Sequence, residues 1–314
     1  MPDHRPAPLI VDTDGGLDDA LAIVLLARSP QVKLAGISSV HGNVAAAAAA
    51  ANSARLLELL GDYTTPVALG ASTPLDQPLH LAHPNDLLRR AIGRPRRRTP
   101  ATSPAADQIV TLAEEHAGAL DLLTLGPLTN IANALRLAPE LPRLLRRVVV
   151  MGGSFDGGNI TEHAEANVHH DPEAADEVFA AGFSLTVVPL DVTRTAIATR
   201  SWLRALVSAA PQRRMKAAAA LGLLAASGKK GPQLRMHDAL AAAVLLDRQV
   251  TTDHHVSPVV VALDGDRRGE TTAVTGDRRP ATIVRAADVD RFRARLLEAL
   301  SGSPAGTDSV QPRY

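Results

Sequence analysis

Residues 8–23 read Pro-Leu-Ile-Val-Asp-Thr-Asp-Gly-Gly-Leu-Asp-Asp-Ala-Leu-Ala-Ile and place four carboxylates, those of Asp12, Asp14, Asp18 and Asp19, between two apolar runs. The run before the aspartates is typical of a strand, and the run after them is typical of a helix. Like charges this close repel one another by about 1 kcal/mol per pair in water, and by more when buried, so the turn needs a cation. Because the donors are oxygens and the chain has no cysteine, the pattern indicates a hard ion, Ca²⁺ or Mg²⁺.

Short apolar segments alternate with alanine- and leucine-rich segments along most of the chain. The expected strands are residues 9–11, 34–40, 66–69, 121–125, 148–151 and 184–190. The expected helices are residues 19–28, 44–60, 106–116, 130–137 and 172–181. This alternation predicts a single α/β domain with a mostly parallel central sheet flanked by helices, a Rossmann-like core. In such sheets ligands bind beyond the carboxyl ends of the strands, and the aspartates, Asn43, Leu125 and Met151 all follow or end strands.

Composition narrows the class of protein further. With 314 residues, 46% of them hydrophobic, the chain can bury one sizeable core, and we expect one domain over residues 1–300 and a disordered tail over residues 301–314. Lys plus Arg and Asp plus Glu number 33 each, so no overall charge recruits nucleic acid or a membrane. The N-terminus lacks the apolar core of a signal peptide, and no apolar run is long enough for a membrane span, so we expect a cytoplasmic protein.

Further motifs follow the aspartate-rich turn in a fixed order. They are His41-Gly42-Asn43, Leu125-Gly126-Pro127-Leu128-Thr129-Asn130, Val150-Met151-Gly152-Gly153 running on to Asn159, Glu165 and Asn167, and His237-Asp238-Ala239-Leu240-Ala241. With the Asp-Thr-Asp-x-Gly-x-Asp-Asp-Ala pattern of residues 12–20, the chain resembles the inosine-uridine-preferring nucleoside hydrolases, which use bound Ca²⁺ to cleave the N-glycosidic bond of ribonucleosides. The resemblance runs from about Leu9 to about Leu300. It implies a Ca²⁺-dependent N-glycosidase, assembled as a homodimer or homotetramer, that releases ribose and a free base.

The resemblance also implies how a metal and the reacting groups are held. Asp14, Asp19, Asp238 and the backbone carbonyl of Leu125 would be the protein ligands of Ca²⁺. Asp14 would be the general base that activates a metal-bound water, and the cation would keep its carboxylate ionised. His237, next to a metal ligand, would protonate the departing base, for which a near-neutral pKa is suited.

Six residues are implied to bind substrate: Asp18, Asn43, Met151, Asn159, Glu165 and Asn167. Asp18 would accept a hydrogen bond from a ribose hydroxyl, and Asn43 and Asn167 would hold the 2′ and 3′ hydroxyls. Asn159 and Glu165 would take the 5′ hydroxyl. The methionine belongs to the core unless it faces the sugar. A carboxylate near the 5′ oxygen repels a phosphate, so nucleosides should be preferred to nucleotides.

The half of the site that would receive the base departs from the family pattern. Residues 70–104 are expected to form a lid or a mobile loop, in which either His80 or His83 is the counterpart of the family's lid histidine. The phenylalanine usual between Glu165 and Asn167 is absent, and residues 215–236 contain no aromatic ring. Without rings to stack on, no particular base can be assigned. The arginine-rich run at residues 94–98 is expected to be a solvated loop, with anion or RNA binding as the alternative.

Two other functions fit parts of the sequence. A Mg²⁺-dependent phosphohydrolase of the haloacid-dehalogenase type also opens with Asp-x-Asp-Gly and would use Asp12 as its nucleophile. However, it needs a lysine and a later acidic pair, for which the chain offers no convincing candidates. A non-catalytic riboside-binding protein would keep the sugar site without turnover. The presence of Asp14 argues against it, because binding a sugar does not require a base.

Overall fold

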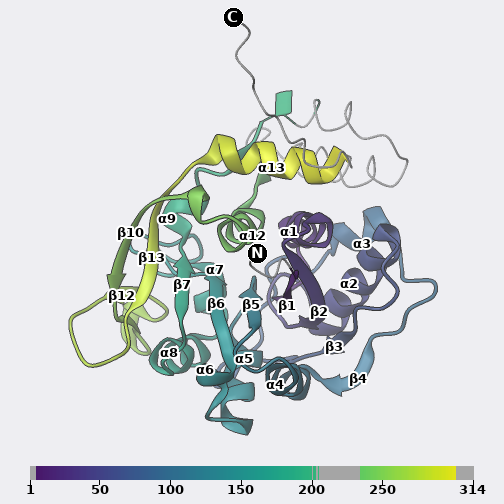
Figure 1. Ribbon diagram of the computed structural model, residues 1–314. Helices are drawn as coiled ribbons and strands as arrows, with labels where there is room; N and C mark the ends of the chain where they lie inside the picture. Colours follow the sequence, from purple (N-terminus) through teal and green to yellow (C-terminus); the bar gives the residue numbers. More distant parts are fainter. Residues whose placement is uncertain (1–4, 200, 203, 205–233, 302–314) are drawn as a thin grey trace, which may run out of the picture.

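The chain folds around one nine-stranded sheet (Figure 1). The computed structural model describes residues 5–199, 201–202, 204 and 234–301. Across the sheet the strands follow the order β10 (Thr251–Ser257), β13 (Ala281–Ala287), β7 (Leu185–Val188), β6 (Leu145–Met151), β5 (Leu120–Thr124), β1 (Ala7–Thr13), β2 (Val32–Ser39), β3 (Val67–Leu69) and β4 (Ala101–Pro104). All neighbours in this sheet run parallel except β10 and β13. The predicted single α/β domain with a mostly parallel sheet is confirmed.

Helices cover both faces of the sheet. One face packs against α1 (Leu17–Arg28), α2 (Ala46–Leu60), α3 (Leu87–Ile92), α12 (His237–Leu246) and α13 (Val289–Ser301). The other face packs against α4 (Ala105–Glu115), α5 (Thr129–Leu137), α6 (Leu141–Leu144) and α8 (Pro172–Ala180). The smaller elements are α7 (Ala166–His170), α9 (Leu190–Thr193), the 3₁₀ helices η1 (Arg248–Val250) and η2 (Gly265–Arg267), and the paired strands β8 (Ile197–Ala198) with β9 (Leu234–Arg235) and β11 (Val259–Val261) with β12 (Thr271–Ala273).

The turn between β1 and α1 depends on glycine. β1 lies at the centre of the sheet, and Leu9, Ile10 and Val11 are fully buried because helices cover both of its faces. Gly15 then adopts a φ of +76°, and a Cβ added there would lie 2.6 Å from the Cα of Ala49 in α2. Only glycine fits both conditions without strain.

The predicted strands and helices are all present, with ends that differ by at most three residues. The segment of residues 70–104, expected to be irregular, contains α3 and the edge strand β4. Residues 205–233, which include most of the ring-free stretch, and residues 302–314 of the expected tail lie outside the described residues. Among the helices that the structure describes, none is long and apolar enough to cross a membrane.

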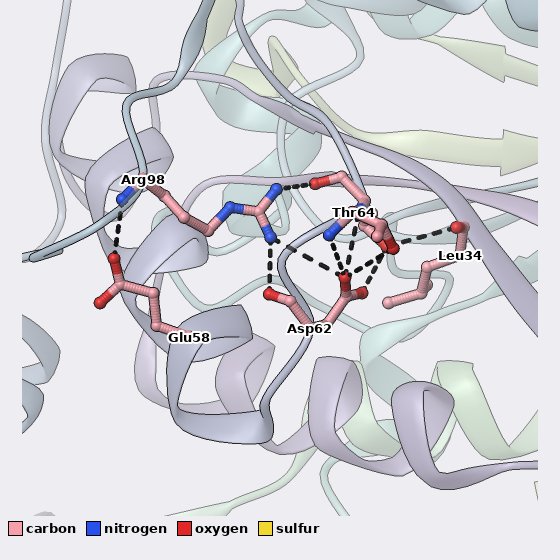
Figure 2. Close-up of polar contacts among 6 residues, drawn as sticks. Leu34, Glu58, Asp62, Thr64 and Arg98 are labelled. Atoms are coloured by element: carbon pink, nitrogen blue, oxygen red, sulfur yellow. Dashed lines mark hydrogen bonds and ion pairs between the residues drawn. The ribbon is translucent and has the colours of Figure 1, made fainter.

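The arginine-rich run at residues 94–98 is anchored to the end of α2 (Figure 2). The backbone amides of residues 96–98 donate to the carboxylate of Glu58 at distances of 2.6 to 3.0 Å. The guanidinium of Arg98 donates to the backbone carbonyl of Asp62 at 2.7 Å. The other arginine side chains of the run are exposed. The run is therefore solvated in its side chains, as expected, but fixed through its backbone.

Candidate active site

Carboxylates from three elements meet at the carboxyl end of β1. β1 carries Asp12 and runs directly into Asp14, the first turn of α1 carries Asp18 and Asp19, and the first turn of α12 carries Asp238. They meet because α1 packs against α12 along its length. Oxygens of Asp18, Asp19 and Asp238 lie within 4.8 Å of one another. This donor set consists only of oxygens and therefore fits a hard divalent cation.

The electrostatics of the cluster also call for a cation. Burial raises the pKa of Asp14 well above its usual range, and the neighbouring charge of Asp19 raises it further. Burial and the charges of Asp18 and Asp19 do the same to the pKa of Asp238. Burial, with the charge of Asp18, raises the pKa of Asp19 to about 6. Carboxylates packed in this way take up protons unless a cation neutralises them.

Asp14 is held by Asn43, which follows β2. The backbone amide of Asn43 donates to Oδ2 of Asp14 at 2.7 Å, and its side-chain amide donates to Oδ1 at 2.8 Å. The intervening Gly42 adopts a φ of +150°, and a Cβ there would collide with the Asp14 carboxylate. The His41-Gly42-Asn43 motif thus places the backbone of Gly42 and both the backbone and the side-chain amides of Asn43 against Asp14, the predicted base.

Polar residues of the same motifs hold two of these carboxylates by hydrogen bonds. The hydroxyl of Thr13 donates to Asp19, which also accepts from the amide of Gly16 at 2.9 Å. Asn130 donates to Asp12 at 2.7 Å, and burial raises the pKa of Asp12 to about 7. Asp12 has no exposed surface. It cannot serve as the accessible nucleophile that the phosphohydrolase alternative requires.

The side chain of Asn167 makes hydrogen bonds to two other predicted site residues. Its side-chain amide donates to the backbone carbonyl of Leu125 at 3.1 Å, to the carbonyl of Met151 at 3.0 Å, and to the Met151 sulfur at 3.4 Å. Met151 is buried in the core. Met151 therefore supports Asn167 from the core, and the Leu125 carbonyl lies at the end of β5, next to β1 in the sheet.

Glu165 is buried and caps α7. Its Oε2 accepts from the backbone amides of Gly153, Asn167 and Val168 at 2.9 to 3.2 Å. Burial raises its pKa to about 7 despite these hydrogen bonds. Asn159 is exposed on the preceding loop, where its backbone amide donates to the carbonyl of Ala164. Of the two residues assigned to the 5′ hydroxyl, Glu165 is thus buried and held by backbone amides, whereas Asn159 is exposed.

His237 begins α12 directly before Asp238. Its Nδ1 lies 2.8 Å from the hydroxyl of Thr193 in α9. Burial and the charges of Arg235 and Arg194 lower its pKa to about 4. The expectation of a near-neutral pKa is therefore corrected, because the ring is buried beside two cations and is neutral at pH 7.

The lid segment brings a histidine to the carboxylates. The backbone amide of His83 donates to the carbonyl of Asn43 at 2.7 Å. Burial raises the pKa of Asp18, and the charge of His83 is among the groups that oppose this. His80 instead stacks on His170, with ring centroids 5.7 Å apart. Of the two candidates, His83 is the one whose backbone contacts Asn43.

Asn52 in α2 was not singled out from the sequence. Its buried side chain donates to the carbonyl of Gly15 at 3.3 Å and to the Asp86 carboxylate at 2.9 Å. It thereby ties the aspartate-rich turn to the start of α3. The only sequence signal was one amide within an alanine-rich helix, where a polar residue is out of keeping with the apolar pattern.

Comparison with known sequences matches the chain over nearly its whole length. The model of the family described as inosine-uridine preferring nucleoside hydrolase matches residues 9–294. The non-specific ribonucleoside hydrolase RihC of Salmonella paratyphi A is 35% identical over 302 residues, which cover 94% of this chain and 98% of the relative.

Solved structures give the same result. A plant nucleoside hydrolase, the PpNRh1 enzyme, superposes with a TM-score of 0.87 at 27% identity and covers 95% of this chain and 100% of its own. A purine-preferring ribonucleoside hydrolase from Gardnerella vaginalis superposes with a TM-score of 0.84 at 27% identity and covers 94% and 98%. On these grounds the chain belongs to the inosine-uridine preferring nucleoside hydrolase family.

Proposed function

We propose that this nucleoside hydrolase cleaves the N-glycosidic bond of a ribonucleoside with the help of one bound Ca²⁺. The observation that carries the proposal is the meeting of buried carboxylates from β1, α1 and α12, three of which can place oxygens within 4.8 Å of one another. Such a cluster is costly to fold unless it binds a cation. Family membership accounts for the hydrolase activity, and the oxygen-only donors favour Ca²⁺ or Mg²⁺.

The cation would be held by Asp14, Asp19, Asp238 and the carbonyl of Leu125, and Asp18 also has an oxygen within 4.8 Å of oxygens of Asp19 and Asp238. A divalent cation in such a site lowers the pKa of a bound water and attracts the ribose hydroxyls. Ca²⁺ is favoured over Mg²⁺ because it accepts more oxygens and less regular geometry.

Asp14, Asn167 and His237 would each have a separate role in the reaction. Asp14, oriented by Asn43, would take the proton from the attacking water. Asn167, fixed by the Leu125 and Met151 carbonyls, would hold a ribose hydroxyl through its amide oxygen. His237 is neutral at pH 7, so it would assist the departing base by a hydrogen bond rather than as a cationic acid. Cleavage passes through an oxocarbenium-like state, which the surrounding carboxylates stabilise.

The residues assigned to the ribose do not determine which base is released. The relatives differ here, because one is named non-specific and another purine-preferring. We therefore assign the substrate class as ribonucleosides and leave the base to experiment. Glu165, which we assign to the 5′ hydroxyl, would repel a 5′ phosphate when ionised, so nucleosides should be cleaved faster than their 5′-monophosphates.

The test is release of ribose from purine, pyrimidine and p-nitrophenyl ribosides, with matched 5′-monophosphates, before and after chelation and re-addition of Ca²⁺ or Mg²⁺. Asp14→Asn should lower the rate by about 10²- to 10⁴-fold, the range of a general base. Asp253→Asn, which changes an exposed carboxylate on β10, is the matched control and should keep full activity.

Each outcome decides part of the proposal. Loss of activity on chelation with recovery in Ca²⁺ supports the metal assignment, and equal recovery in Mg²⁺ contradicts the preference for Ca²⁺. Full activity in Asp14→Asn contradicts its role as the base. If no riboside releases ribose in Ca²⁺, the catalytic proposal is wrong, and tight riboside binding without turnover would identify a binding protein.

A further inference from the structure

A cavity of about 660 Å³ lies apart from the aspartate cluster, around the first half of β6 and β7. Its walls come from β6, β7, β13, β10, α12 and η1, and the four strands run side by side at one end of the sheet (Figure 1). On β6, Arg147 lines this cavity, whereas Met151 contacts Asn167 in the candidate active site. At about 3.3 Å per residue these two positions lie roughly 13 Å apart, so the cavity is a second site.

Two arginines on its wall share one buried carboxylate. Asp121 on β5 is fully buried and is paired in register with Arg147 on β6. Arg146 donates to both Asp121 oxygens at 2.7 and 2.6 Å, and Arg147 donates to Oδ2 at 3.0 and 2.8 Å. Two cations thus meet a single anion, which leaves a net positive charge. The side chain of Arg146 is 45% exposed, so its remaining N–H groups can reach a ligand.

A third arginine adds a charge without a counterion. The side chain of Arg248, on η1, is exposed and makes no hydrogen bond or ion pair with any residue that the structure describes. The neighbouring carboxylate of Asp247 does not neutralise it, because Arg291 and Arg295 bind that carboxylate at 2.5 and 2.8 Å. His254 on β10 also lines the cavity, and no carboxylate among the described residues does.

The rest of the lining is both apolar and rich in hydroxyls. The apolar residues are Val149, Leu185, Val244 and Val284, and the hydroxyl residues are Ser184, Thr186, Thr251 and Thr282. The register places Val149 beside Thr186, and Thr186 beside Thr282, so these side chains form one row across β6, β7 and β13. Cationic forks and hydroxyls suit phosphate oxygens, and an apolar floor suits a planar ring.

We propose that this cavity binds a small organic phosphate, a phosphate monoester attached to a ring-bearing group of nucleoside size. The phosphate would lie between Arg248 and the Arg146–Arg147 pair, and the ring would lie on the valines. Bidentate contacts from guanidinium groups make arginine well matched to phosphate. The site is independent of riboside cleavage, because no residue of the aspartate cluster contributes to it.

Binding is tested by isothermal titration calorimetry with adenosine 5′-monophosphate, inorganic phosphate and adenosine. Arg248→Gln should weaken binding of the monophosphate by about tenfold or more, since a charged hydrogen bond of about 1.5 kcal/mol or more is lost. Arg28→Gln is the matched control, because Arg28 is an exposed arginine of α1 outside the cavity, and it should bind as the wild type does. Thermal unfolding of both variants checks that they fold.

The competing results are distinct. Weaker binding in Arg248→Gln, a steep loss of affinity with added salt, and unchanged ribose release from nucleosides support the site. Equal affinity for inorganic phosphate and the monophosphate overturns it in favour of a simple anion patch. Unchanged affinity in Arg248→Gln, with competitive inhibition of ribose release by the monophosphate, overturns it in favour of binding at the aspartate cluster.

Discussion

Asn43 fixes the direction of the Asp14 carboxylate through both of its oxygens. The side-chain nitrogen of Asn43 is used in this contact, while its amide oxygen has the capacity to accept from a ribose hydroxyl. One side chain can therefore orient the base and hold the sugar. The two roles affect kinetics differently, since orientation acts in the transition state and sugar binding acts in both states.

We predict that Asn43→Ala lowers kcat by about 10- to 100-fold, because the backbone amide alone leaves Asp14 free to rotate. Asn43→Asp should lower kcat further, because it sets a like charge against Asp14. Steady-state ribose release with saturating Ca²⁺ measures both effects. An increase in KM with kcat unchanged would show that Asn43 holds only the sugar.

Asp18 and Asp19 lie close together because their spacing within a strand–turn–helix motif already fixes their neighbourhood. Asp238 could be placed with them only through the family resemblance, since it lies on α12, far along the chain. Asn52 and His83 gain their contacts solely from packing of α2 and the lid segment onto the turn. No local pattern carries that information.

At the scale of elements, α2 and the arginine-rich run are joined by one carboxylate. Burial alone would raise the pKa of Glu58, but the amides of residues 96–98 and the guanidinium of Arg55 lower it to about 2. This carboxylate therefore stabilises the folded state when ionised. The contribution is fully present above the ordinary pKa of about 4.5 and is lost as the pH falls toward 2.

We predict that Glu58→Gln lowers the free energy of unfolding by about 2 kcal/mol at pH 7, because the charge-assisted hydrogen bonds of the ionised carboxylate are lost. The difference from wild type should shrink as the pH falls from 5 toward 2. Glu114→Gln, which changes an exposed glutamate of α4, is the control and should have little effect. Urea unfolding across this pH range measures the gap, and a gap independent of pH would contradict the assigned role of the charge.

Elements with strong periodicity were predictable, and those at the sheet edge were not. The central strands are continuous apolar runs because both faces of the sheet are covered. β10 is exposed over most of its length and shows no alternation, so its sequence does not distinguish a strand from a loop. It is a strand because β13 offers a partner edge. Short elements such as α3 likewise depend on tertiary contacts, here the Asn52–Asp86 hydrogen bond.

At the scale of the whole molecule, the parallel sheet brings the motifs that follow β1, β2, β5 and β6 to the carboxyl ends of these strands, where α12 adds Asp238 and like charges gather. Strands β1, β2, β5 and β6 end beside one another, so residues widely separated in sequence converge. The carboxylates of the aspartate cluster repel one another, and a bound cation would offset this repulsion. Stability of the protein should therefore depend on metal.

We predict that Ca²⁺ at about 100 times its dissociation constant stabilises the protein by about 2.7 kcal/mol and raises Tm by roughly 5 °C, and that a chelator reverses this. Asp238→Asn should lose most of this Ca²⁺-induced rise in Tm, because the substitution removes a ligand. The metal-free variant, however, should unfold at the same temperature as metal-free wild type or at a higher one, because a buried like charge is gone. Asp253→Asn should behave as wild type. Differential scanning calorimetry with and without Ca²⁺ measures all three proteins. An equal Ca²⁺ shift in Asp238→Asn and wild type would show that the cation binds elsewhere, whereas a less stable metal-free variant would show that the cluster is held by shared protons rather than strained by charge.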